Sequence, residues 1–181
     1  MSARAILTYE DYVALPDDGR RYELYEGDLI VTPAPRPRHQ LVIGSLHVLM
    51  AEHVRRHALG EVFLSPIDVI LSRITVVQPD LVYVETARLG IVTERALEGA
   101  PTLVVEVLSP STDARDRDVK QALYARHGVP YYWIVDPAAR TIQGLRLGGE
   151  LYETVARLDE AAPEALPPLT GLTLDPAAVW R

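Results

Sequence analysis

The chain has 181 residues, of which 48% are hydrophobic, so it can bury one sizeable core and is short for two. We therefore expect a single domain over residues 1–181. The formal net charge of -7 argues against a protein whose whole surface grips nucleic acid, so any site for a polyanion must be local. Cysteine is absent, which excludes disulfides, thiolate metal sites and a cysteine nucleophile.

The apolar runs of the sequence bear on where the protein is found. Residues 1–7 contain too short an apolar run for a secretory signal, and no later run approaches the length of a membrane span. We therefore expect a cytoplasmic protein that has no membrane partner.

The N-terminal part of the chain is predicted to hold two helices and a hairpin. Thr8 can cap a short helix over residues 9–15. Strand-like runs at residues 21–26 and 28–32 flank a glycine and predict a hairpin. Apolar side chains at helical spacing then predict a long helix over residues 38–58, which would pack on a sheet.

Short strands follow, separated by proline and serine. These runs are rich in β-branched residues, and we expect them to form a meander of four strands at residues 61–64, 67–71, 75–77 and 81–84. A nearly continuous apolar run at residues 102–108 is typical of a buried strand. A second helix over residues 113–127 precedes another buried strand at residues 131–135, and a helix between two strands indicates a crossover.

The C-terminal part is predicted to be a hairpin and a tail. Strand-like runs at residues 141–147 and 150–157 flank a pair of glycines, and a proline-spaced tail ends in a short turn near residues 177–180. The core of the domain is therefore expected at about residues 38–147.

Lysine occurs once in this sequence. Seventeen of the eighteen basic residues are arginine, and the exception is Lys120. Arginine replaces lysine on most solvated surfaces, but its planar fork cannot reproduce a compact ammonium that contacts one oxygen or donates one proton. The retained lysine therefore points to a catalytic role, although chance in an arginine-rich composition would leave an occasional lysine on a helix face.

Two carboxylates fall where a charge is unexpected. Glu106 interrupts the apolar run between Val105 and Val107, and Asp80 stands at the start of another buried strand. A buried carboxylate requires a cation, a metal ion or a hydrogen-bond network beside it. If neighbouring strands bring the two together, a hard divalent cation such as Mg²⁺ relieves their repulsion, and the Val107 carbonyl could add a ligand. For Asp80 alone, the stronger interpretation is that it is an ordinary turn residue after Pro79.

Lys120 lies on the helix that follows the strand of Glu106. It shares one helix stripe with Asp116 and Tyr124 at four-residue spacing. The alternative to a functional role is a solvated ion pair between Asp116 and Lys120, which is worth only a few tenths of a kcal/mol and which arginine would form equally well.

Several motifs in this order resemble the Uma-type restriction endonucleases of the PD-(D/E)XK nuclease superfamily. The resemblance covers most of the chain and is specific because the order and spacing of the motifs agree. The motifs are Leu15-Pro-Asp-Asp-Gly19, Tyr22-Glu-Leu24 with Gly27, Arg38-His39-Gln40, Pro79-Asp80, Val105-Glu-Val-Leu-Ser-Pro-Ser-Thr112, Asp116 with Lys120 and Tyr124, and Tyr132-Trp-Ile-Val-Asp-Pro137.

The resemblance implies an α/β restriction-endonuclease-like fold with a central mixed β-sheet flanked by α-helices. It also implies an endonuclease that hydrolyses DNA phosphodiester bonds, with Asp80 and Glu106 holding Mg²⁺ and Lys120 orienting or activating the attacking water. The match departs from the simplest pattern, which places lysine two residues after the glutamate, where this chain has Leu108. Lys120 is the only candidate for a lysine that has migrated to the following helix. Glu23 matches a position where related folds supply an auxiliary acidic residue.

Other candidates are weaker. His39 is the better of these and resembles a family position near the site, and the alternative is that it caps the helix. His53 and His57 are four residues apart but lack a third ligand, so packing is the favoured interpretation. Six arginines could form a local phosphate-facing surface: Arg36, Arg38, Arg55, Arg56, Arg115 and Arg117. The aromatic side chains of residues 131–133 are expected in the core, and Ser109 and Ser111 are expected to serve the loop and the helix start.

Two other interpretations remain open beside the nuclease. The chain could be a catalytically silent binding or assembly module with a nuclease fold, or a structural homodimer whose acidic residues form only buried ion pairs. A homodimer also suits the nuclease, because many enzymes of this class pair to cut both DNA strands.

Overall fold

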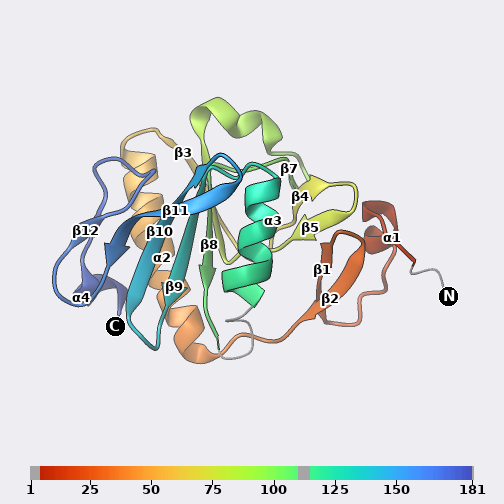
Figure 1. Ribbon diagram of the computed structural model, residues 1–181, viewed down its shortest axis with the longest axis horizontal. Helices are drawn as coiled ribbons and strands as arrows, with labels where there is room; N and C mark the ends of the chain where they lie inside the picture. Colours follow the sequence, from red (N-terminus) through yellow and green to blue (C-terminus); the bar gives the residue numbers. More distant parts are fainter. Residues whose placement is uncertain (1–4, 110–114, 181) are drawn as a thin grey trace.

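A six-stranded mixed sheet forms the centre of the computed structural model, which describes residues 5–109 and 115–180. In spatial order its strands are β11 (Leu151–Leu158), β10 (Thr141–Gly148), β9 (Tyr131–Asp136), β8 (Leu103–Val107), β6 (Leu81–Glu85) and β3 (Gly60–Leu64). Only β8 and β9 pair in parallel, and the other neighbours are antiparallel. The predicted α/β class and the central mixed sheet are confirmed (Figure 1).

Helices cover both faces of this sheet because its central strands are apolar on both sides. The long helix α2 (Pro37–Arg56) packs Leu46 against Val105 and Trp133 on one face. On the other face, Tyr124 from α3 (Gln121–Arg126) packs against a cluster that includes Val104. Successive residues of β8 therefore enter opposite layers, as the two-residue period of a strand requires. The predicted crossover between β8 and β9 is confirmed by their parallel pairing.

The helix predicted over residues 113–127 differs from the structure at its start. Asp113 lies outside the described residues, and the backbone over Arg115–Lys120 is a π-helix that passes into α3 at Gln121. Short π segments occur mostly as local bulges, frequently at functional sites. The change of helix type ends at Lys120 itself, so this residue sits at a junction rather than on a uniform helix face.

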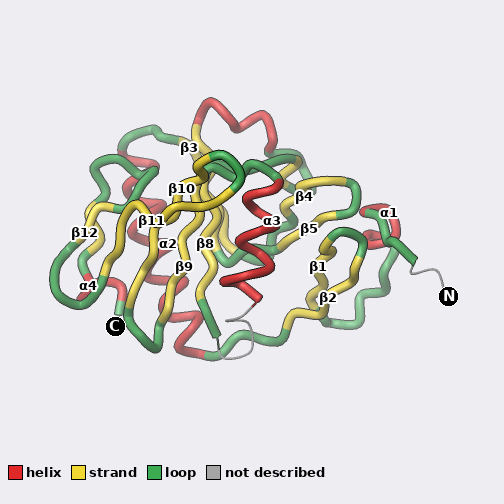
Figure 2. Tube along the Cα trace, in the orientation of Figure 1, coloured by secondary structure: helices red, strands yellow, loops and turns green. Residues whose placement is uncertain are grey.

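A second, five-stranded sheet packs beside α3, which the sequence did not indicate. In spatial order its strands are β2 (Asp28–Thr32), β1 (Arg21–Tyr25), β5 (Thr75–Val77), β4 (Val69–Ser72) and β7 (Leu97–Glu98). Tyr25, Val69 and Val77 join the same apolar cluster as Tyr124. In Figure 2 the smaller sheet lies to the right of α3, which stands in front of the main sheet.

The predicted meander is wrong, whereas the predicted N-terminal hairpin is confirmed. Strand β3 pairs with β6. The β4–β5 hairpin, which lies between them in the sequence, belongs to the smaller sheet. Strand order depends on long-range packing, which four short apolar runs with similar punctuation cannot encode. The β1–β2 hairpin needs only its own turn, where Glu26 and Gly27 both have positive φ.

The remaining elements are short. They are α1 (Tyr9–Val13), a 3₁₀-helix (Thr86–Ile91), β12 (Glu164–Ala165), β13 (Thr173–Leu174) and α4 (Pro176–Val179). Thr8 and Asp11 form the capping box of α1, as predicted for Thr8. The C-terminal tail packs against the α2 side of the core, where the Trp133 indole N–H donates to the Pro167 carbonyl at 2.6 Å. Among the described helices, none is long and apolar enough to cross a membrane.

Two glycines allow opposite tests of this fold. Gly60 has φ +142° where β3 begins, and a Cβ there would lie 2.8 Å from the Glu85 Cα of the paired strand. Gly44 lies on the exposed face of α2 with no atom within 4 Å of a Cβ. We expect Gly60→Ala to lower the free energy of unfolding by at least about 2 kcal/mol. Gly44→Ala should raise it by about 0.5–1 kcal/mol, because alanine loses less backbone entropy in a helix. Urea unfolding measures both, and equal effects would contradict the strand geometry at Gly60.

Candidate active site

The two carboxylates predicted from sequence converge at one end of the main sheet. Leu81 pairs with Val105 in the β6–β8 ladder, so the continued register places Asp80 directly opposite Glu106. Opposite residues of an antiparallel pair point to the same face and have Cβ atoms about 5 Å apart. Both residues are buried, with 8% and 3% of their surfaces exposed. The β6–β8 pairing therefore sets the two acidic residues at the same end of the main sheet.

Asp80 is held by the backbone of the neighbouring strand. Its Oδ2 accepts a hydrogen bond from the Val107 N–H at 2.8 Å and lies 3.3 Å from His39 Nε2. Among the residues that the structure describes, Asp80 Oδ1 accepts no hydrogen bond. The same register sets Pro79 opposite Val107, and proline has no N–H to donate to the Val107 carbonyl. Among the described residues, Asp80 Oδ1 therefore accepts no bond, and the Val107 carbonyl has no donor on the residue opposite it.

Lys120 reaches back from the helix to the strand, as its long stem was expected to allow. Its ammonium lies 2.8 Å from Glu106 Oε1 and 3.2 Å from Glu23 Oε1. The lysine is only 5% exposed. Two carboxylates bind it from the main sheet and the smaller sheet, so Lys120 is a buried charge rather than the solvated one of the alternative interpretation. The side chain of Asp116 itself lies outside the described part of the chain.

Glu23 is the second carboxylate of this network and comes from β1. It is 1% exposed, and its oxygens accept bonds from the Gln78 N–H at 2.7 Å, the Tyr25 hydroxyl at 2.7 Å and the Thr32 hydroxyl at 3.2 Å. Burial raises the pKa of this carboxyl, but Lys120 and the hydrogen-bond donors outweigh burial and hold the pKa of Glu23 below its usual value. Glu23 is therefore ionised and provides a fixed negative charge for Lys120.

Tyr124 completes the network around Glu106. Its hydroxyl donates to Glu106 Oε1 at 2.6 Å, the same oxygen that Lys120 contacts. Burial, and then the Glu106 carboxylate, raise the pKa of Tyr124 well above its usual value. The hydroxyl therefore stays protonated and acts as a donor. Lys120 and Tyr124, which were predicted to share one helix stripe, thus contact the same oxygen of Glu106.

A small cavity of about 40 Å³ opens beside these groups, with room for an ion and one or two waters. Its lining includes Asp80, Glu106, Val107, Lys120, His39, Gln78 and Arg21. A larger hollow of about 410 Å³ lies next to it, and His39 and Ser109 line both. Asp80, Glu106 and Lys120, which were predicted from separate parts of the sequence, therefore line one small cavity.

The donor set fits Mg²⁺, which usually takes one or two carboxylates and keeps several waters. Asp80, Glu106 and the Val107 carbonyl supply hard oxygen ligands. Within residues 5–109 and 115–180, no group of three or more His, Cys, Asp or Glu side chains is arranged as a metal cage.

The other predicted residues lie in different places. His53 Nε2 donates to the Thr170 carbonyl at 3.0 Å, and the His53 ring contacts the His57 ring, which supports the packing interpretation. Tyr132 and Trp133 are fully buried, as expected for core residues. Ser109 borders the cavities, whereas Ser111 is outside the described residues.

The six arginines do not form one surface. Arg36 and Arg38 line the larger hollow at the start of α2, while Arg55 and Arg56 lie at its far end, about 27 Å away by helix rise. Arg117 pairs with Asp136 at 3.0 Å. The side chain of Arg115 is not among those described. The prediction of a common arginine surface is therefore wrong for these four residues, because the length of α2 separates Arg36 and Arg38 from Arg55 and Arg56.

Comparison with known proteins places this geometry in context. The Uma2 family, described as "Putative restriction endonuclease", matches residues 9–177. Among solved structures, the chain is similar to a "putative nuclease belonging to DUF820" from Anabaena variabilis ATCC 29413, with a TM-score of 0.79. The sequences are 19% identical, and the match covers 96% of this chain and 97% of the other. At this identity the likeness shows the fold alone. No curated protein matches the sequence.

The buried network gives a test by stability and pH. In Lys120→Met, two buried carboxylates lose their cation, so we expect the free energy of unfolding at pH 7 to fall by about 3–5 kcal/mol. Without the cation, burial should raise the pKa of Glu23 above its unfolded value. A group with a raised pKa is stabilising at low pH, so the deficit of the variant should shrink as the pH falls toward 5. In the wild type the sign is opposite, because the pKa of Glu23 is lowered and its contribution is lost with falling pH.

Urea unfolding of both proteins between about pH 5 and 8 measures this difference. Adding Glu23→Gln to Lys120→Met removes one of the two unpaired carboxylates and should recover part of the loss. A deficit that stays constant across this pH range would contradict the proposed charge state of the network.

Proposed function

Because the chain belongs to the Uma2 family, described as putative restriction endonucleases, we propose that it is a Mg²⁺-dependent endonuclease that hydrolyses DNA phosphodiester bonds. The observation that carries the proposal is the meeting of Asp80, Glu106 and Lys120 around one cavity. Family membership and the nuclease fold support a nuclease role in general. The metal, the substrate and the catalytic roles of these residues belong to the proposal.

In this proposal, Asp80, Glu106 and the Val107 carbonyl hold Mg²⁺. When bound, the ion supplies charge neutralisation at the phosphate and a water of lowered pKa. The Val107 N–H orients the Asp80 carboxylate toward the cavity. Tyr124 and Lys120 together fix Glu106 from the helix side.

Lys120 has the second role, which is to orient the attacking water and to stabilise negative charge on the scissile phosphate. Its ammonium is held at the cavity by Glu23 and Glu106, so it needs little reorganisation during the reaction. Glu23 is then a positioning residue that acts through the lysine. His39 borders the same cavity and contacts Asp80, which makes it a second positioning candidate.

The same ion pairs also favour a second candidate, a nuclease-fold module without catalysis. In the structure Lys120 is neutralised by two carboxylates, as in a purely structural network. The single domain, the homodimer and the cytoplasmic location also remain predictions. Catalysis and metal binding separate the two candidates.

Cleavage of supercoiled plasmid in Mg²⁺ or Mn²⁺ tests the enzyme. We expect Asp80→Asn and Glu106→Gln to lower cleavage by about 100-fold or more, since even residues behind a metal ligand often account for 10- to 100-fold. Lys120→Arg should abolish cutting because the fork cannot replace the ammonium between two carboxylates. Matched controls are Glu61→Gln and Arg126→Lys, both at exposed positions. Unchanged cutting in a folded Lys120→Arg protein would reject the role of the lysine.

Metal binding is tested without any substrate. A ligand that binds only the native state raises its stability, by about 2.7 kcal/mol at one hundred times the Kd. We therefore expect the melting temperature of the wild type to rise with Mg²⁺ concentration and that of Asp80→Asn to stay constant. Equal responses in the two proteins would place the ion elsewhere.

A further inference from the structure

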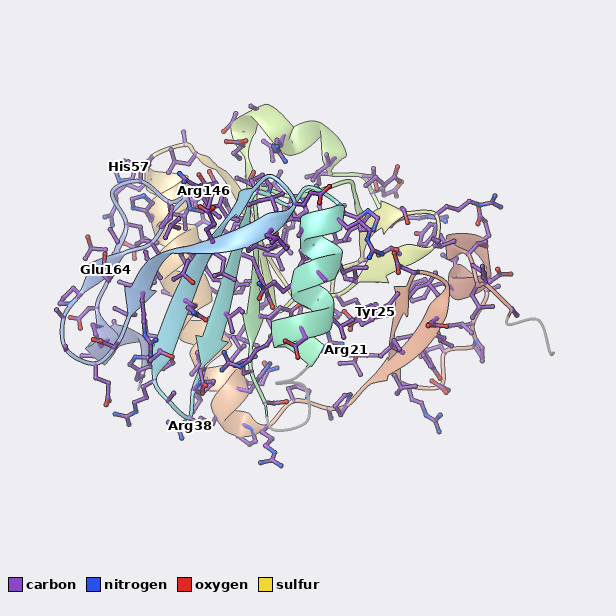
Figure 3. The ribbon with its side chains drawn as sticks, in the orientation of Figure 1. Arg21, Tyr25, Arg38, His57, Arg146 and Glu164 are labelled. Carbon is purple, nitrogen blue, oxygen red and sulfur yellow. The ribbon has the colours of Figure 1, made fainter. Side chains whose placement is uncertain are left out.

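Arg21 lines the active-site cavity, although no sequence motif indicated a role for it. It begins β1, where it pairs with Thr32 of β2, and it borders the cavity with Asp80 and Lys120. Figure 3 shows it beside the lower end of α3, near Tyr25. The hairpin therefore contributes a cation to the wall of the cavity that faces the main sheet.

The contacts of Arg21 are all with neutral oxygen atoms. Its Nε donates to the Gln78 side-chain oxygen at 3.1 Å, and its Nη2 donates to the Ser65 hydroxyl at 2.7 Å and the Gln78 carbonyl at 3.4 Å. Across the described chain, no carboxylate pairs with this guanidinium and no residue accepts from Nη1. These bonds fix the orientation of the Arg21 guanidinium, and no described carboxylate neutralises its charge.

Gln78 is oriented to hold Arg21 in this position. Its side-chain nitrogen donates to Asp68 Oδ1 at 2.8 Å and to the Tyr12 hydroxyl at 3.2 Å. The amide oxygen must therefore face the other way, toward Arg21. The backbone N–H of the same residue donates to Glu23, and Asp80 follows two positions later. One residue thus links Arg21 to the lysine network and to the acidic pair.

Two of the neighbouring cations differ from Arg21 because they pair with carboxylates. Lys120 contacts two carboxylates, and Arg117 pairs with Asp136. Arg36 and Arg38 are exposed at the adjoining hollow and, within the described residues, also pair with no carboxylate. Arginines that pair with no carboxylate among the described residues therefore line both the small cavity and the adjoining hollow. A ligand with repeated negative charges, such as a phosphodiester strand, matches this series.

We propose that Arg21 is a substrate-binding residue whose Nη1 group donates to a phosphate oxygen of a nucleic-acid strand that lies across the opening of the cavity. This inference rests on the proposed function and assigns one phosphate contact of that site. Arginine suits the role because its planar fork can hold Gln78 and Ser65 on one side and a phosphate on the other.

Binding of a fluorescein-labelled DNA duplex, followed by anisotropy in Ca²⁺, tests the contact apart from catalysis. We expect Arg21→Gln to weaken binding roughly 10- to 100-fold, as for one charged hydrogen bond. The slope of log Kd against log salt should fall by about one unit between about 50 and 200 mM NaCl. Arg73→Gln is the matched control, because Arg73 is exposed, pairs with Glu10 and lines neither cavity. It should leave affinity and slope close to the wild type.

A second pair of variants keeps the test valid if Arg21→Gln does not fold. Ser65→Asp places a carboxylate beside the guanidinium and should cancel its charge without removing it, so binding should weaken as in Arg21→Gln. Ser65→Ala removes the hydroxyl alone and should bind DNA almost as the wild type does. Equal binding by Ser65→Asp and Ser65→Ala would overturn the inference.

The outcomes separate this inference from the proposed function. If the wild type cuts DNA and Arg21→Gln matches Arg73→Gln in affinity and slope, the inference is overturned while the nuclease proposal stands. If the wild type binds DNA without cutting it and Arg21→Gln binds weakly, the inference is supported and the catalytic proposal fails. If the wild type neither binds nor cuts DNA, both are rejected.

Discussion

The burial of one ammonium between two carboxylates is the interaction on which the candidate site depends. Lys120 comes from the helix after the crossover, Glu106 from the main sheet and Glu23 from the smaller sheet. A charge this deeply buried is tolerated only with partners and hydrogen bonds. Those bonds come from the hydroxyls of Tyr25 and Tyr124 and from the backbone N–H of Gln78. Three layers of the fold must therefore be in place before this charge arrangement exists.

Lysine and arginine have different tasks around the cavity. The lysine is a compact charge approached by carboxylates from two directions, which a guanidinium of fixed plane cannot satisfy in the same space. Arg21 is instead held by neutral oxygens of Gln78 and Ser65, and it lines the cavity. The arginine-rich composition makes this difference visible, because a single lysine remains where geometry requires one.

The sequence predicted the local elements and the central residues of the site better than their arrangement. The capping box at Thr8, the first hairpin and the crossover follow from nearby residues, and all are present. The meander failed because pairing of β3 with β6 depends on packing across the whole domain. Glu106 and Lys120 were identifiable because each is an exception in its surroundings. Tyr25, Gln78 and Arg21 have no such signal, since a polar residue on an alternating strand looks like ordinary surface until the second sheet covers it.

The origin of Glu23 in the small sheet has a consequence for the dynamics of the site. In the smaller sheet, β2 is the edge strand, and the β1–β2 hairpin joins the other strands where Leu24 of β1 pairs with Val76 of β5. Proteins open in cooperative units whose free energies lie below that of global unfolding. Detachment of this hairpin would withdraw Glu23 and Arg21 together, while the β6–β8 pairing beside Asp80 and Glu106 remained. Slow amide exchange at Leu24 and Val76 would then report the lifetime of the complete site, separately from the stability of the sheet that carries its acidic residues.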